Sequence, residues 1–126
     1  GVHEAGVDAR RLKALRGLAR GCALPVRAYI MASARDTALA RALVAAGPDT
    51  AGAGGVTVRA IKAYYDGALG SRGARLLAPY ADAPEAQGVA GAAYGFDSAL
   101  VARLVAAGFQ VGIHAIGDAG NREVLD

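Results

Sequence analysis

The order of helix-like and strand-like segments is the feature that most constrains the fold of this chain. Apolar residues at helical spacing follow good N-cap residues and predict three helices, at residues 8–20, 36–46 and 97–107. Apolar, β-rich runs predict three strands, at residues 24–32, 56–64 and 109–115. A further helix is expected to begin near Asp118. This alternation favours an α/β fold, in which crossover helices join the strands of a parallel sheet.

A long connection, at about residues 65–95, follows the second predicted strand. Connections of this length are uncommon in compact domains unless they have a function, so we expect a lid or a substrate-contact loop. The alternation is compatible with an open doubly wound sheet and with an arc of a (β/α)8 barrel. In both architectures the chemistry lies at the carboxyl ends of the strands, and the candidate residues are sought there.

Composition narrows the classes of protein to which this chain can belong. Its 126 residues are 54% hydrophobic and 20% charged, as expected of a globular domain. The net charge of +3 is spread along the chain without a basic stripe, so we expect no nucleic-acid partner. No apolar run reaches membrane-spanning length and no signal-peptide pattern is present, so we expect no membrane partner and a cytoplasmic protein. The single cysteine, Cys22, excludes an intramolecular disulfide.

Lys62 is the most informative single residue. The chain has only two lysines, and Lys13 lies on the polar face of the first predicted helix. Lys62 lies inside an apolar strand, where the strand period of two puts it on the face of Ala60 and Tyr64. Burial lowers the pKa of a lysine, and a neutral amine can act as a base, form a Schiff base or add carbon dioxide to become a metal-bridging carbamate. The alternative is a lysine that extends to solvent or pairs with Asp66.

His114 closes the last predicted strand and is a candidate metal ligand. The alternative is a packed, hydrogen-bonded histidine. Asp118 follows it and is expected to be the N-cap of the last helix, or else to orient the His114 imidazole. The pair His3-Glu4 is placed at the end of an earlier strand, where it could line the same pocket or belong to a frayed terminus.

The segment Asp66–Gly73 is rich in glycine and contains Arg72. Its backbone N–H groups could converge on an anion, and Arg72 could bind a carboxylate or a polarised carbonyl. The glycine spacing differs from the dinucleotide-binding fingerprint. The alternative function that this loop permits is a small-molecule or phosphate-binding α/β module without hydrolytic activity.

Two long motifs are distinctive in this sequence. The first is Ile61–Ala74 together with Leu77–Asp82, and the second is Gly108–Asp118 together with Asn121–Leu125. These motifs strongly resemble amidohydrolase family 3, the branch of the metal-dependent amidohydrolases that contains N-substituted formamide deformylase. The opening Gly1–Asp8 is also similar to a family segment, so the resemblance extends along the whole chain.

The resemblance implies a metal-dependent (β/α)8 TIM-type barrel, of which this chain would cover about three to four βα units. It implies a divalent metal, most simply zinc, as one or two ions. Lys62, carboxylated, and His114 match metal-ligand positions. Asp66 and Arg72 would contact substrate or shape the pocket, and Asp118 would support His114. The implied reaction is hydrolysis of a non-peptide carbon–nitrogen bond in a small amide or formamide substrate.

The chain departs from the family pattern in its ligand set and its length. It has no His-x-His pair, and the later histidine, the catalytic aspartate and an accessory β-sandwich would lie outside it. We therefore expect residues 1–126 to be an internal fragment of the barrel domain, inactive alone, with the remaining barrel segments as its partner. The exposed sheet edges of such a fragment favour pairing or aggregation.

Overall fold

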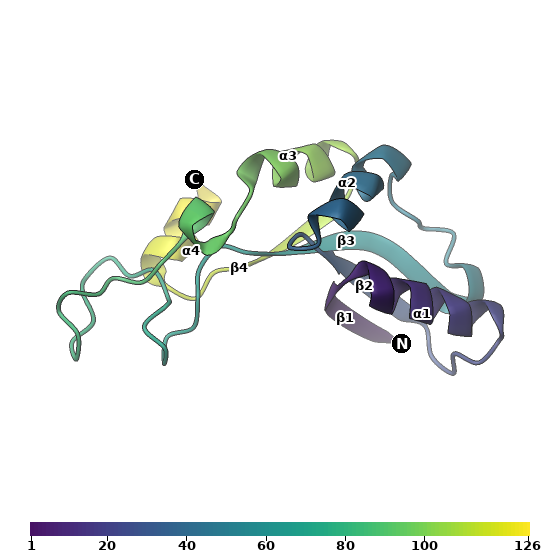
Figure 1. Cartoon of the computed structure of the whole chain (residues 1–126), viewed down its shortest axis with the longest axis horizontal. Helices are drawn as coiled ribbons and strands as arrows, with labels where there is room; N and C mark the ends of the chain where they lie inside the picture. The colour runs from purple at the N-terminus through teal and green to yellow at the C-terminus, as the bar shows by residue number, and fades with distance from the viewer. The chain divides into compact units, whose positions relative to one another are not determined.

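The computed structural model describes all 126 residues and alternates strands with helices (Figure 1). The elements are β1 (Val2–Val7), α1 (Ala9–Arg20), β2 (Ala28–Ser33), α2 (Thr37–Ala46), η1 (Ala53–Gly55), β3 (Val56–Tyr64), η2 (Gly91–Tyr94), α3 (Ser98–Ala106), β4 (Gln110–His114) and α4 (Asp118–Leu125). The sheet order is β1-β2-β3-β4, and β1 pairs with β2 and β2 with β3 in parallel. The predicted α/β alternation is confirmed.

The first strand corrects one expectation. β1 runs from Val2 to Val7, so His3 and Glu4 lie near its beginning and not at its carboxyl end. Gly6 has a φ of 92°, at the point where the pairing with β2 shifts register. His3 stacks on Tyr29 near the start of β2, with ring centroids 4.8 Å apart. This pair therefore lies toward the amino ends of the strands, away from the edge where chemistry is expected.

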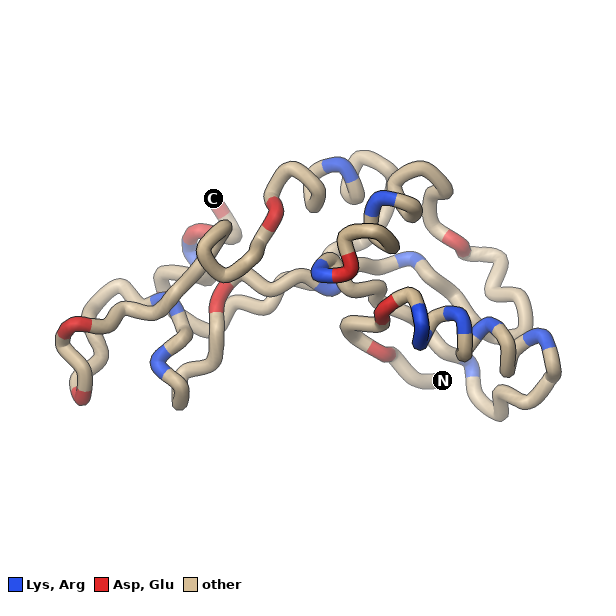
Figure 2. The backbone as a smooth tube through the Cα atoms, in the orientation of Figure 1, with Lys and Arg blue, Asp and Glu red and all other residues tan.

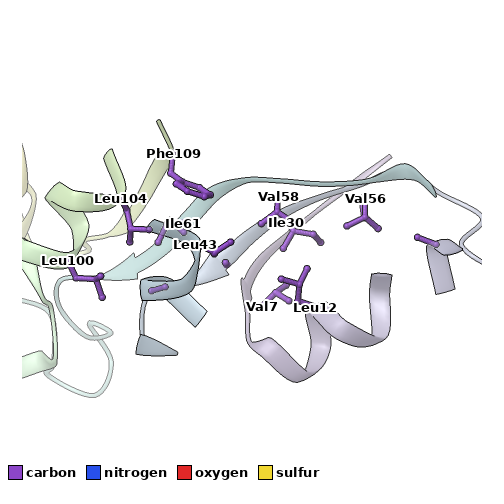
Figure 3. Packing of buried hydrophobic residues seen from close by; sticks show 14 residues of the cluster. Val7, Leu12, Ile30, Leu43, Val56, Val58, Ile61, Leu100, Leu104 and Phe109 are labelled. Carbon is purple, nitrogen blue, oxygen red and sulfur yellow. The ribbon is translucent and has the colours of Figure 1, made fainter. Parts of the chain in front are cut away.

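The chain forms two compact units, one made of residues 1–63 and 99–112 and the other of residues 64–98 and 113–126. The first unit holds the hydrophobic core, in which the apolar stripes of the helices pack on one face of the sheet (Figure 3). Its largest buried side chains include Leu12, Leu43 and Leu104 from helices and Ile30 and Ile61 from strands. Burying each such side chain is worth about 1.5–3 kcal/mol, so this layer fixes which face of each strand turns inward.

A β-bulge in β3 sets the direction of Lys62. The parallel pairing with β2 skips one position of β3, so that Arg59 is an extra residue. As a result Val58 and Ile61 both belong to the core cluster, although three positions separate them. Strict alternation from Val58 would have turned Lys62 toward the helices. The bulge instead leaves Lys62 on the opposite face, aligned with Ser33 of β2, which agrees with the predicted face.

Cationic and anionic residues are spread along the chain (Figure 2). Several cations lie along α1. Arg10, Arg11 and Lys13 are exposed there, while Leu12 and Ala19 are buried. These cations form a solvated helix face. None of the helices combines the length and the hydropathy required to cross a lipid bilayer.

Candidate metal-binding site

His114 is the last residue of β4 and belongs to the second unit, in which two side chains lie beside its imidazole. The ring of Tyr64 lies against it, with centroids 5.5 Å apart and planes tilted by 40°. Its Nε2 atom lies 4.0 Å from Oδ1 of Asp66, and the side chain is 28% exposed. Tyr65 N–H donates to the His114 carbonyl at 2.8 Å, which fixes the backbone at this position. Nε2 therefore lies on the side of Asp66, at a separation longer than a hydrogen bond.

Asp66 is fully buried, and its carboxylate accepts three backbone hydrogen bonds. The donors are the N–H groups of Arg75 at 2.9 Å, Ile116 at 2.9 Å and Gly117 at 2.8 Å. Burial opposes ionisation of this carboxyl, but the three N–H donors outweigh it and hold the pKa of Asp66 below its usual value. Asp66 therefore joins three segments of the second unit, and the structure places it away from solvent.

Three glycines allow the segments around Asp66 to pack closely. A Cβ on Gly117 would lie 1.8 Å from the carbonyl oxygen of Arg75, and a Cβ on Gly120 would lie 2.7 Å from Oδ2 of Asp66. A Cβ on Gly88, whose φ is 81°, would lie 2.0 Å from the carbonyl oxygen of Ala74. Glycine is thus required at these three positions, where the loop backbone passes close to the chain after β4 or to another part of the loop.

Lys62 lies in the first unit, near the carboxyl end of β3. Its backbone carbonyl accepts a hydrogen bond from Ala34 N–H at 2.9 Å, just beyond β2. Its side chain is half-buried, and burial lowers the pKa of its amine. The direction of this shift is the one that favours a neutral, reactive amine.

Arg72 and Asp118 have partners within the second unit. Arg72, which has a φ of 56°, forms an exposed ion pair with Asp82 at 3.0 Å. Asp118 is the first residue of α4 and is not its N-cap, which is Gly117. The Asp118 carboxylate accepts N–H groups from Leu77 at 2.9 Å and from Ala119 at 2.8 Å. Asp118 therefore ties the long loop to the start of α4, a role that the helix-cap interpretation missed.

The glycine-rich segment closes on itself. The N–H of Gly67 donates to the carbonyl of Gly73 at 3.0 Å, and the N–H of Gly73 donates to the carbonyl of Ala68 at 2.9 Å. The N–H of Arg72 donates to the carbonyl of Leu69 at 2.9 Å. These amides are used inside the loop and do not converge on a ligand, so the geometry gives no support to the anion-binding alternative.

The sequence did not reveal the importance of Tyr64 and Glu123. Tyr64 lies beside His114, and its position at the end of β3 was the available signal. Glu123 accepts from the hydroxyl of Tyr65 at 2.8 Å and from Nε of Arg75 at 3.4 Å, so α4 is bonded to the loop by a second carboxylate. Nothing in the local sequence indicated that contact, because its partners are 58 and 48 positions away.

A neutral imidazole and a carboxylated lysine are both suitable donors for a divalent metal. The chain has no group of three or more His, Cys, Asp or Glu side chains placed to hold an ion. A catalytic zinc site uses about three protein ligands, which is more than the two candidate donors Lys62 and His114.

Comparisons with known proteins show what the chain is similar to. The sequence profile described as "Amidohydrolase family" matches residues 5–126. The chain is similar to the crystal structure of an uncharacterized metal-dependent hydrolase from Pyrococcus horikoshii OT3, with 26% identity and a TM-score of 0.85. It is similar to a second uncharacterized metal-dependent hydrolase, from Pyrococcus furiosus, with 27% identity and a TM-score of 0.84.

Each alignment covers 100% of this chain but only 26% of the solved structure. No curated protein matches the chain. The profile match extends over nearly all of the sequence, including both long motifs and the residues around Asp66 and His114. The chain therefore belongs to the amidohydrolase family.

Proposed function

We propose that the whole protein containing this chain is a metal-dependent hydrolase of non-peptide carbon–nitrogen bonds in amide or formamide substrates. Family membership and the likeness to two metal-dependent hydrolases support the reaction class. The resemblance of the two motifs to the formamide deformylase branch supports the type of bond. The substrate is then a small molecule, and the remaining barrel segments complete the site.

The observation that carries this proposal is the position of two donors on neighbouring strands. Lys62 lies near the carboxyl end of β3, and His114 is the last residue of β4, which is next to β3 in the sheet. In parallel α/β folds the chemistry is placed at this edge. The bulge that turns Lys62 away from the helices supports its role as a ligand, because the helix-facing side is filled by the core.

His114 and Lys62 would each supply one donor atom to the metal. His114 would bind through Nδ1, because Nε2 faces the buried Asp66. The neutral Nζ of Lys62 would form an N–C bond with carbon dioxide and lose a proton, which gives an anionic oxygen donor. When bound, a divalent metal, with zinc as the best candidate, supplies Lewis acidity that activates water and polarises the scissile carbonyl.

Arg72 is the residue that we propose for contact with substrate. Its ion pair with Asp82 is exposed on both sides, and solvent screens pairs of this kind, so a substrate carboxylate or carbonyl can replace Asp82 at little cost. Asp66, which the sequence also suggested, would shape the pocket instead, since its carboxylate is enclosed.

Metal analysis of the whole protein tests the proposal. The wild type is expected to retain about one or two zinc ions per chain after gel filtration, and the Lys62→Ala and His114→Ala variants are expected to lose them. The chain offers matched controls, because Lys13→Ala and His3→Ala remove its other lysine and its other histidine. Retention of metal in both Lys62→Ala and His114→Ala would overturn the ligand assignment.

A further inference from the structure

We propose that Asp66 is a positioning residue whose buried carboxylate fixes the turn after His114 and thereby sets the direction of the imidazole. This inference rests on the proposed function of His114 as a metal ligand. It assigns a role to the least exposed carboxylate of the chain, which does not itself complete a metal site.

The hydrogen bonds of Asp66 are aimed at the chain immediately beyond His114. Oδ1 accepts from Ile116 N–H, and Oδ2 accepts from Gly117 N–H. On the other side, the N–H of Tyr65, the residue before Asp66, donates to the His114 carbonyl. Two consecutive residues at the exit of β3 thus hold the backbone of His114 from both directions.

The influence of Asp66 on the imidazole passes through this backbone. The separation of 4.0 Å between Oδ1 and Nε2 exceeds hydrogen-bond length. Both oxygens are occupied by N–H donors, and Oδ2 also accepts from Arg75 N–H. A displacement of the turn at residues 116–117 would therefore move His114, while the loss of a direct side-chain contact would not be the main effect.

Only a carboxylate suits this position. Three N–H groups converge on it, and they require two acceptor oxygens. An asparagine would present one oxygen and one NH₂ group, and the NH₂ group would face an N–H donor. A longer side chain would not fit, because the position is fully buried and the Gly120 backbone is packed against Oδ2.

The test compares Asp66→Asn with a matched variant, Asp36→Asn, in the whole protein. Asp36 also accepts two backbone N–H groups, from Ala9 at 2.9 Å and Leu39 at 3.0 Å, but it lies in the other unit. Zinc affinity is measured by chelator competition, and backbone opening by hydrogen exchange of the metal-free protein. Asp66→Asn is expected to weaken zinc binding by about 10- to 100-fold, as is typical when a group supporting a ligand is lost.

Hydrogen exchange gives a readout that does not depend on metal. We expect faster exchange at Arg75, Ile116 and Gly117 in Asp66→Asn and unchanged exchange there in Asp36→Asn. Wild-type zinc affinity together with unchanged exchange in Asp66→Asn would overturn the inference. If the variant does not fold, slow exchange of these three amides in the wild type supports the inference and fast exchange overturns it. If the wild type binds no zinc, the proposed function fails, whereas the exchange data still decide whether Asp66 holds the turn.

Discussion

Gly117 and Arg75 are packed so closely that a Cβ at position 117 would lie 1.8 Å from the Arg75 carbonyl oxygen. The obstacle is backbone, so no side-chain rotation can relieve it. The same backbone stretch donates the Arg75 N–H to Asp66 and accepts the N–H of Gly120 through the Arg75 carbonyl. The long loop is therefore fastened to the turn after β4 at its middle and is not a freely hinged lid.

Gly117→Ala is expected to destabilise the protein. The added methyl group must displace the loop backbone, which costs about 1–3 kcal/mol, as overpacking does in a filled interior. Gly70→Ala is the matched control, since a Cβ there meets nothing within 4 Å and its φ is not positive. Chemical denaturation of the whole protein gives the comparison. Equal midpoints for the two variants would show that the Gly117–Arg75 approach does not constrain the fold.

Deletion of Arg59 is expected to cost less than deletion of Thr57. Without the extra residue Arg59, Val58 and Ile61 are two positions apart, and regular alternation still turns both toward the core. Deletion of Thr57 instead makes Val56 and Val58 adjacent, so that one of them must leave the core. An exposed side chain costs about 1.5–3 kcal/mol, so the free energy of unfolding should fall by about that much more for the Thr57 deletion than for the Arg59 deletion. Equal thermal unfolding of the two deletion variants would contradict the role of the bulge.

Asp36 is expected to give a pH-dependent contribution to stability. Hydrogen bonds from Ala9 N–H and then Leu39 N–H lower the pKa of Asp36 in the folded chain. A lowered folded-state pKa means that the stabilisation is present above the unfolded value of about 3.9 and is lost as the pH falls through the folded value.

The measurement for Asp36 is the difference in unfolding free energy between the wild type and Asp36→Ala as a function of pH. At pH 7 the loss of this N-cap should cost about 1 kcal/mol, and the difference should shrink below about pH 4. Glu85→Ala, at an exposed carboxyl, is the control and should show little difference at any pH. A difference for Asp36→Ala that stays constant down to pH 2 would contradict the assignment.

The sequence predicted the helix starts well, because N-capping is a local interaction. Asp8 accepts the N–H of Arg11 at 2.8 Å, and Asp36 accepts that of Leu39 at 3.0 Å, as their types and positions indicated. The strand limits were less accurate. β2 begins at Ala28 and not at residue 24, because the strand is defined by its partner: Ala28 is the first residue aligned with both β1 and β3.

The sequence identified which residues belong to the candidate site, but not how they are oriented or buried. The types and strand-end positions of Lys62 and His114 identified them. The bulge at Arg59 depends on how β3 pairs with β2, which no local pattern encodes. The burial of Asp66 depends on donors that lie 9, 50 and 51 positions away in the sequence, so a loop residue that looked free to contact substrate is enclosed by the fold.

The assignment of Lys62 and His114 as metal ligands is tested most directly by a crystal structure of the whole protein with zinc, with the metal located by its anomalous scattering. We expect an ion at about 2.0–2.1 Å from Nδ1 of His114 and at about 2.0–2.2 Å from an oxygen of a carboxylated Lys62. A zinc ion bound elsewhere, with Lys62 unmodified and His114 outside its coordination sphere, would contradict it.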